Sequence, residues 1–386
     1  MTSTLTPPAP TDPSTADDRF VALAAEIGRR AAPADAAHDR DASFVTEAYA
    51  AMAETGYLAM AVPAELGGGG ATLRQVVLAE HELARWSGAS ALAAAMHLYL
   101  TFVQRFRYAK GFADAEAALR RIATEGLVMA TSGGSDWVCP TTTAVAVDGG
   151  FRFTGRKGFC TQAPVATVIS TSAVLGEPGP DAEVLHAGVP MSSPGVRIVE
   201  TWDPLGMRGT ASHDVVLEDV FVPAERVTGR RPYGVLAGPL LLAASYFAPV
   251  AGAVYLGVAQ GAYDEALRQV AAKAEVVPST VRQLGEMQAR IRVARWALLA
   301  AVEETGDTFG PDHGVLATLM TAKRHAVLEA VAVTDLALQV VGGPAFSRRS
   351  PLEQAYRDVR GGPFHPLTPE LTLTTVGEAA LAAARA

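Results

Sequence analysis

The side chains of this sequence best suited to chemistry are a hydroxyl residue and two histidines. Thr161 follows Phe159 by two residues, directly after a predicted β-hairpin. His365 lies in a loop rich in glycine and proline, whereas His97 lies in an apolar helical stretch. An imidazole exchanges its proton near neutral pH, so it suits acid-base work. A lone histidine on an apolar helix is often structural instead, and Phe159 alone could be an ordinary core aromatic.

Composition limits the class of protein. The chain has 386 residues, of which 49% are hydrophobic and 19% charged, which predicts a helix-rich protein with two or three packed units. Its net charge of -8 argues against a nucleic-acid partner. Two cysteines, Cys139 and Cys160, provide neither a disulfide framework nor metal-ligand spacing, so we expect no metal and a reducing, cytoplasmic setting. Apolar runs such as residues 238–244 are too short to span a membrane.

The elements that must position these residues fall into three blocks. Apolar residues recur at three- and four-residue steps in the first and last blocks, which predicts helices. In the middle block, Val145–Phe153 alternates apolar and other residues around an Asp-Gly-Gly turn, which predicts a hairpin. The expected fold is α+β: a disordered leader (1–18), an N-terminal helical domain (19–125), a middle β-barrel-like domain (126–231) and a C-terminal four-helix bundle (232–386).

Three segments carry a resemblance to a known family. Gly155–Gln162 (GRKGFCTQ), Asp203–Pro223 (DPLGMRGTASHDVVLEDVFVP) and Gln339–Asp358, with its Gln-x-x-Gly-Gly and Arg-Asp elements, occur in the order and spacing of the acyl-CoA dehydrogenases. The resemblance covers roughly residues 20 to 380. It implies a flavin-dependent oxidoreductase with FAD, or with FMN as the alternative.

The resemblance also implies residue roles. Phe159 would pack against the flavin ring, and Thr161 would bond near its N5 atom, where a fixed hydroxyl tunes hydride acceptance. The other residues that match cofactor-binding positions of the family are Ser135, Arg208, Ser212, Gln339, Gly342 and Gly343. In the family the Gly-Gly turn approaches the flavin of a neighbouring subunit, so a homodimer or homotetramer is implied.

The sequence departs from the family at the catalytic base. The position that aligns with the usual glutamate is Pro366, which has no proton acceptor. Some members place the base on the first helix of the bundle instead, and there the sequence has Phe247 and Ala248. The Glu-Pro before the Gly-Ser-Asp turn and the arginine motif near residues 273–278 are also missing, which puts tight flavin binding in doubt.

Three functions remain open. His97, Thr161 and His365 resemble the set with which two-component flavin monooxygenases of this fold stabilise the oxygen adduct of reduced flavin, so a monooxygenase or oxidase acting on a small or carrier-bound substrate is slightly favoured. The alternative is an acyl-CoA or acyl-carrier dehydrogenase whose base is His365 or Glu370. A non-catalytic flavin-binding protein is a remote third. The expected partners are a substrate and a flavin reductase or electron-transfer flavoprotein, with no nucleic acid and no membrane.

Overall fold

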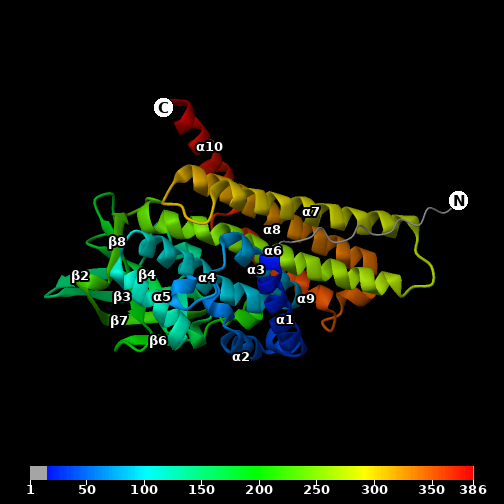
Figure 1. The fold of residues 1–386 in the computed structure, drawn as a ribbon, viewed down its shortest axis with the longest axis horizontal. Helices are drawn as coiled ribbons and strands as arrows, with labels where there is room; N and C mark the ends of the chain where they lie inside the picture. The colour runs from blue at the N-terminus through cyan, green and yellow to red at the C-terminus, as the bar shows by residue number, and fades with distance from the viewer. Residues whose placement is uncertain (1–14, 386) are drawn as a thin grey trace.

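The computed structural model describes residues 15–385, and its N-terminal part is helical as predicted (Figure 1). The first helix begins at Thr15, so the last four residues of the expected leader are helical, because no proline interrupts the chain between Pro13 and Pro33. The rest of the leader lies outside the described residues. The helices of this block are α1 (Thr15–Asp41), α2 (Thr46–Thr55), α3 (Leu73–Trp86), α4 (Gly88–Ala109) and α5 (Ala113–Glu125).

The middle block forms one sheet. Its strands are β1 (Met129–Thr131), β2 (Thr143–Val147), β3 (Gly150–Cys160), β4 (Val168–Leu175), β5 (Glu183–Pro190), β6 (Val196–Val199), β7 (His213–Pro223) and β8 (Val227–Pro232). They run in the order β6-β7-β3-β2-β4-β5-β8, with β1 beside β4. The predicted hairpin is confirmed, since β2 and β3 pair with Val147 opposite Gly150. Because β3 and β7 are antiparallel with Cys160 opposite His213, the segment around Thr161 meets the start of β7.

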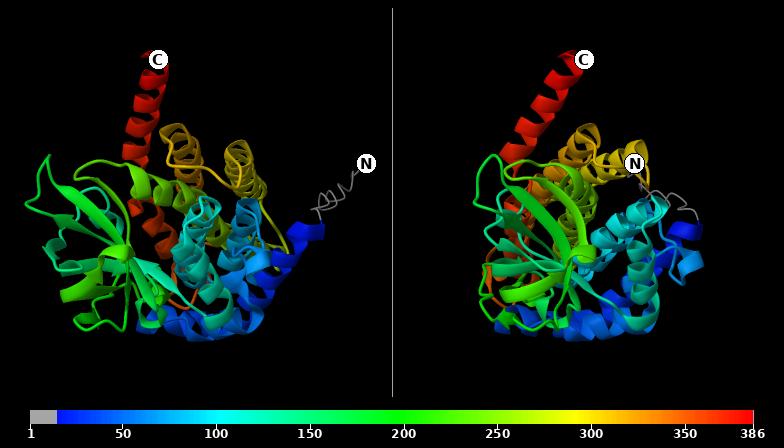
Figure 2. Two further views of the ribbon diagram at one scale, coloured as in Figure 1. Left: turned by 60° about the vertical axis from the view of Figure 1, so that its left-hand side comes forward. Right: turned by 90° about the vertical axis from the view of Figure 1, so that its left-hand side faces the viewer.

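The C-terminal block supplies the long helices α6 (Gly238–Ala271), α7 (Pro278–Thr305) and α8 (His313–Val341), then α9 (Pro351–Asp358), the 3-10 segment η8 (Val359–Phe364) and α10 (Pro369–Arg385). The predicted helical character of this block is confirmed, with three long helices packed together and the shorter α10 as the fourth. Helix α10 packs on α8 near its start and then projects away from the bundle (Figure 2).

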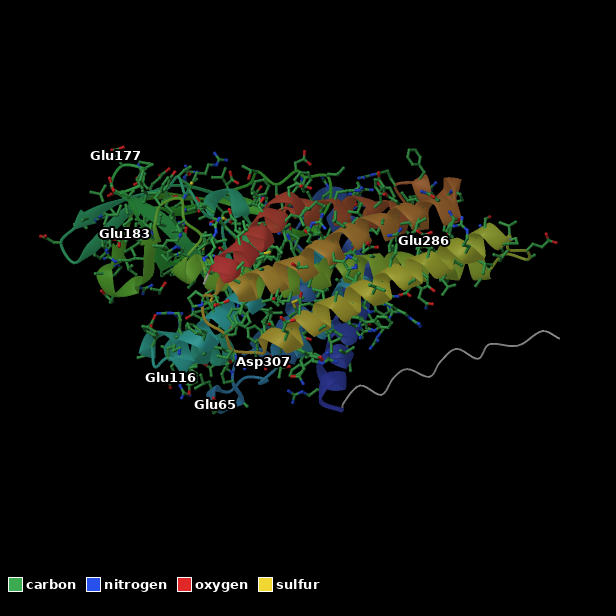
Figure 3. The ribbon with its side chains drawn as sticks, turned by 90° about the horizontal axis from the view of Figure 1, so that it is seen from above. Glu65, Glu116, Glu177, Glu183, Glu286 and Asp307 are labelled. Atoms are coloured by element: carbon green, nitrogen blue, oxygen red, sulfur yellow. The ribbon has the colours of Figure 1, made fainter. Side chains whose placement is uncertain are left out.

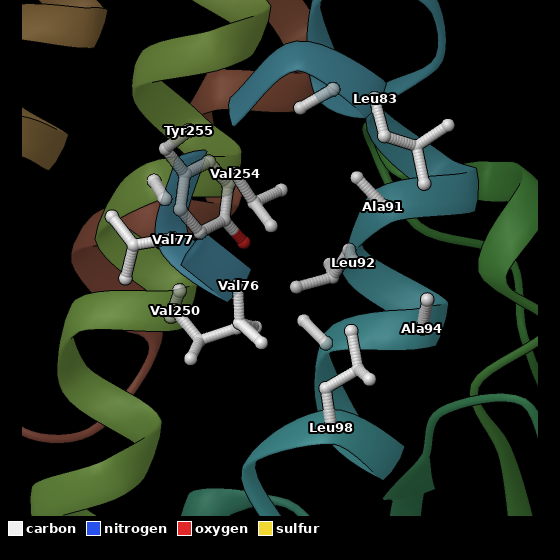
Figure 4. Packing of buried hydrophobic residues seen from close by; sticks show 14 of the residues in the cluster. Val76, Val77, Leu83, Ala91, Leu92, Ala94, Leu98, Val250, Val254 and Tyr255 are labelled. Carbon is white, nitrogen blue, oxygen red and sulfur yellow. The ribbon is translucent and has the colours of Figure 1, made fainter. Parts of the chain in front are cut away.

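Helix α6 is the centre of the fold. It packs against α3 and α4 of the first block on one side and against α7 and α8 on the other. Figure 4 shows Val250 and Val254 of α6 close to Val76 and Val77 of α3, with Leu92 of α4 nearby. By length and composition α6 is apolar enough to cross a membrane, yet 94% of its most apolar window is buried inside the protein. Its apolarity therefore fits a core helix.

Surface ion pairs are numerous, and a hydrogen bond from one loop fixes the start of α3. Figure 3 shows acidic side chains such as Glu116 and Glu286 at the periphery, where each pairs with an arginine one helical turn away. Exposed pairs of this kind contribute little to stability. Asp307, from the connection between α7 and α8, accepts a hydrogen bond from the Leu73 amide at 2.8 Å and so caps the first turn of α3.

Candidate active site

A cavity of about 620 Å³ lies where the three blocks meet. Its walls come from α4, the loop after β1, the end of β3, the turn before β7, α6, and η8 with the loop that follows. The lining residues are Leu92, Met96, Tyr99, Thr131, Ser132, Gly133, Gly134, Trp137, Phe159, Thr161, Trp202, Pro204, Leu205, Gly206, Met207, Ser212, Phe247, Tyr255, Arg357, Arg360, Gly361, Phe364, His365, Pro366, Thr368 and Leu371. This described lining contains no aspartate and no glutamate.

Two strained segments form one wall. Phe159 at the end of β3 has φ +56° and Met207 in the turn before β7 has φ +54°, and nearby Gln162 and Ala211 also have positive φ. Such values are rare for residues other than glycine and cluster at functional sites. The strain turns Phe159 outward, where its ring is 60% exposed and meets Trp202 edge-on at 5.8 Å. The wall is therefore aromatic, and the packing of Phe159 against a flavin ring stays a prediction.

Thr161 heads a chain of hydroxyl groups in the same wall. Its hydroxyl oxygen lies 2.9 Å from that of Ser212, which lies 2.8 Å from that of Thr210. Thr210 donates to the Met207 carbonyl at 2.9 Å, and a carbonyl can only accept. Thr210 must therefore accept from Ser212, and Ser212 from Thr161. The direction of this hydroxyl chain leaves Thr161 with a lone pair for the cavity.

Arg208 is not part of the lining, and its predicted cofactor contact is corrected. Its guanidinium donates to the Asp39 carbonyl at 2.6 Å, to the Asp203 carboxylate at 2.7 Å and to the Pro204 carbonyl at 2.8 Å. These bonds draw the side chain away from the cavity and tie the turn to α1. Ser212, only four residues further on, does line the cavity.

His365 reaches the cavity as predicted. Its ring stacks on Phe247 with centroids 5.6 Å apart and planes 14° apart, and meets Tyr255 edge-on at 5.6 Å. The described residues offer its ring nitrogens no hydrogen-bond partner. Burial, together with the positive charge of Lys323, lowers the pKa of His365 to about 3. The imidazole is therefore neutral near pH 7.

The position of the usual base also faces the cavity. Pro366 lines it beside His365, and a Cβ on Gly134 would come within 2.6 Å of the proline ring. Glycine at 134 thus allows the loop after β1 to press against the proline. Phe247, the other base position of the family, sits among aromatic rings and contacts Tyr99 and Trp137 edge-on. Both positions that the family resemblance assigns to a base line the cavity, and neither has a carboxylate.

His97 has a structural role, which corrects its assignment to the catalytic set. It does not line the cavity and its side chain is fully buried. The Met129 amide donates to Nδ1 at 3.1 Å, so Nε2 holds the proton and donates to the Leu58 carbonyl at 3.0 Å. Burial lowers its pKa to about 4. Both nitrogens are occupied, and the ring joins α4 to β1.

The predicted diphosphate contacts lie elsewhere. Gln339, Gly342 and Gly343, at the end of α8, are exposed and do not line this chain's cavity. A Cβ on Gly343 would meet open space, so packing within one chain does not require glycine there. Their contact with a neighbouring subunit's flavin stays a prediction. The side chain of Ser135 is not among those described, and its predicted role also stays a prediction.

The Arg-Asp element, Arg357 and Asp358, supports the wall of the cavity through hydrogen bonds and ion pairs. Arg357 pairs with Asp39 at 2.8 Å and with Glu353 at 2.7 Å. Asp358 accepts a hydrogen bond from the Met207 amide, and burial raises the pKa of its carboxyl to about 7. These bonds hold α9 against α1 and fix the turn that carries Met207. From sequence this element indicated only the family resemblance, and its supporting role was not predicted.

Two further contributions were missed. Trp137 and Trp202 are isolated tryptophans that no motif marks, although both line the cavity. Lys323, inside the apolar stripe of α8, is fully buried and donates to the backbone of the His365 loop. A charged residue within such a stripe is the signal that would have found it.

Family models identify the class of protein. The N-terminal, middle and C-terminal domains of acyl-CoA dehydrogenase match residues 18–109, 130–220 and 245–381. The chain belongs to the acyl-CoA dehydrogenase superfamily, and it is a flavin-dependent oxidoreductase of the fold that the motifs predicted.

Relatives within the superfamily differ in chemistry. YdbM of Bacillus subtilis (strain 168), named as an acyl-CoA dehydrogenase, is 29% identical over 85% of this chain and 87% of its own length. The amino sugar nitrososynthase DnmZ of Streptomyces peucetius is 29% identical over 85% of this chain and 84% of its own. The structure of KijD3 in complex with FMN and a dTDP-amino-keto sugar has a TM-score of 0.85 at 27% identity, covering 97% of this chain and 95% of that one.

Proposed function

We propose that this protein is a flavin-dependent monooxygenase that oxidises a small molecule whose reacting part is uncharged. The observation that carries the proposal is the cavity lining, which has no carboxylate although both base positions of the family face it. Removal of a proton alpha to a thioester needs a positioned base of suitable pKa. The described lining does not supply one, whereas oxygenation does not require proton abstraction from carbon.

The dehydrogenase alternative is weaker on the same grounds. With a pKa of about 3, His365 is a poor proton acceptor near neutral pH, although its neutral ring can donate or accept a hydrogen bond. Glu370 is exposed on α10 and does not line the cavity. Neither candidate for a relocated base therefore meets both requirements of position and pKa.

The lining suits a flavin. Phe159 and Trp202 offer flat apolar surfaces for a planar ring, and Ser132 and Thr161 offer polar groups for its heteroatoms. Bound there, a reduced flavin would supply the electrons that activate oxygen. FMN, as in the KijD3 structure, and FAD, as the family resemblance implies, both remain open. The missing arginine motif favours a loosely held flavin delivered by a separate reductase.

The substrate side of the cavity is mainly aromatic. The rings of Tyr99, Trp137, Phe247 and His365 surround it. Two arginines border the cavity: Arg357 pairs with Asp39 and Glu353, whereas Arg360 pairs with Asp335 through one nitrogen and its buried Nε has no partner among the described residues. The aromatic walls accept an uncharged, flat or apolar reacting group.

The test is product analysis with isotopically labelled oxygen. The protein would be mixed with photoreduced FMN or FAD, labelled oxygen and one of three substrate panels: uncharged aromatic heterocycles and thioethers, amino sugar nucleotides, or acyl-CoA thioesters. We expect labelled oxygen in a product of the first or second panel. Bleaching of oxidised flavin by an acyl-CoA without oxygen, with no labelled product in any panel, would contradict the proposal.

A further inference from the structure

Lys323 is a buried cation without an anionic partner. Its side chain on α8 is fully inaccessible, and no ion pair joins it to a described carboxylate. Its ammonium donates to the carbonyl of His365 at 2.7 Å and to that of Leu367 at 2.9 Å, with the Pro366 carbonyl at 3.5 Å. One side chain therefore bonds three successive residues of the loop that carries the histidine of the cavity.

A lysine is a costly means of filling core space. Taking an ammonium group out of water carries a large free-energy penalty, which the carbonyl dipoles offset in part. Burial accordingly lowers the pKa of Lys323 to about 7. A methionine would fill nearly the same volume without that penalty. The cost points to a task for the bonds themselves.

The loop has few other restraints near the histidine. The His365 amide makes only long bonds, at 3.3 Å, to the carbonyls of Gly361 and Gly362. The titratable groups facing the His365 ring are Lys323 from α8 and Tyr255 from α6. The pKa of the Tyr255 hydroxyl is raised far above its usual value by burial, so this group stays neutral. Lys323 therefore gives the ring both its backbone restraint and its charged neighbour.

We propose that Lys323 is a positioning residue of this site, whose hydrogen bonds fix the His365–Leu367 backbone so that the imidazole faces the cavity, stacked on Phe247. The inference rests on the proposed function only in giving His365 a role in the cavity, because the placement itself needs no catalysis.

Helix α8 offers a matched control. Arg324, the next residue, donates through Nε to the Pro369 carbonyl at 3.1 Å, so it holds the same connection four residues beyond His365. Arg324→Gln weakens this second restraint and leaves the bonds of Lys323 unchanged. A general loosening of the connection would affect both variants alike, whereas positioning of the imidazole is specific to Lys323.

The primary experiment is nuclear magnetic resonance of the full-length protein with labelled histidine imidazoles. The His365 signals are assigned as those lost in His365→Phe. We expect them to be shifted by the Phe247 ring current and to show one neutral tautomer from pH 6 to 8. In Lys323→Met they should move toward the positions of a solvent-exposed histidine, while Arg324→Gln leaves them in place. Unchanged His365 signals in folded Lys323→Met would overturn the proposal.

Two further measurements keep the test decisive. If Lys323→Met does not fold, Lys323→Gln retains amide donors without charge, and the proposal then requires the His365 signals to change at least in their protonation behaviour.

The second measurement is the rate at which oxygen reoxidises photoreduced FMN bound to the protein. Lys323→Met should change this rate at least fivefold in the wild-type background and by less than twofold in the His365→Phe background. Equal effects in both backgrounds would contradict action through His365. If the NMR result holds but no oxygenated product is found, only the proposed function fails.

Discussion

The imidazole of His365 lies parallel to the ring of Phe247, with 5.6 Å between the ring centroids. The family resemblance places a catalytic carboxylate at one of two positions, and this chain has Phe247 at one and Pro366, the neighbour of His365, at the other. The stacked contact therefore brings together two segments far apart in sequence. Both base positions line the cavity, and neither carries a carboxylate.

Replacing His365 by phenylalanine separates hydrogen bonding from stacking. The new ring keeps the contact with Phe247, so we expect thermal stability close to that of the wild type. The loss of the imidazole nitrogens should lower oxygenation by about 10²-fold, a typical size for the loss of one preorganised hydrogen-bond donor. Turnover would be measured as labelled product per flavin oxidised. Unchanged turnover with the true substrate would show that the imidazole is a packing element.

Breaking the hydroxyl chain should change which flavin redox state binds. With Ser212 as acceptor, Thr161 presents a lone pair to the cavity, which suits an N–H group such as that of reduced N5. Ser212→Ala frees the Thr161 proton, so affinity for oxidised flavin should rise relative to reduced flavin by about tenfold, the worth of one hydrogen bond. Anaerobic titrations with both redox states measure the ratio. An unchanged ratio would rule out a directional role for the chain.

A methyl group on Gly134 should damage the cavity without unfolding the protein. The added Cβ would lie 2.6 Å from the Pro366 ring, so the loop after β1 must shift. We expect Gly134→Ala to weaken flavin binding at least tenfold. Gly285→Ala is the control, because a Cβ there meets open space within α7 and should stabilise the helix by up to about 1 kcal/mol. Equal flavin affinity in both variants would contradict the close packing.

His97 should make stability depend on pH in a defined direction. Its pKa in the folded protein, about 4, is below the unfolded value of 6.5, so the unfolded chain binds the proton more readily. The contribution is fully present above pH 6.5 and is lost as pH falls toward 4, with a slope approaching about 1.4 kcal/mol per pH unit. His97→Gln retains one donor and one acceptor and removes this titration. Urea unfolding at pH 7 and pH 5 should show a smaller loss in the variant than in the wild type.

The sequence predicted the architecture well, because periodicity and turn chemistry are local signals. The hairpin around Asp148 and Gly149 and the stripe of α8 could be read directly from spacing. The placement of Phe159, Thr161 and Pro366 around one cavity came from motif order, and the structure agrees with it. Local signals could not reveal that Phe159 adopts a positive φ, since an aromatic residue carries no preference for that conformation.

The errors have a common physical origin. His97 and Arg208 are residue types with obvious chemistry, and the sequence cannot show whether their polar atoms are already occupied. For both, the partners are backbone groups distant in sequence, such as the Met129 amide and the Asp39 carbonyl. Lys323 was missed for the converse reason, because its partners are carbonyls that any sequence would provide.

The strained turns at Phe159 and Met207 bear on how this scaffold diversifies. Both are anchored to the sheet and to buried bonds, so this half of the cavity is rigid before any ligand arrives. The opposite half, from α6 and the loop after η8, consists mostly of side chains that change without altering the backbone. New substrates can therefore be acquired by exchanging residues on one side while the other side keeps its shape. Conservation of the rigid side and drift of the other is the pattern that such an arrangement would leave among its descendants.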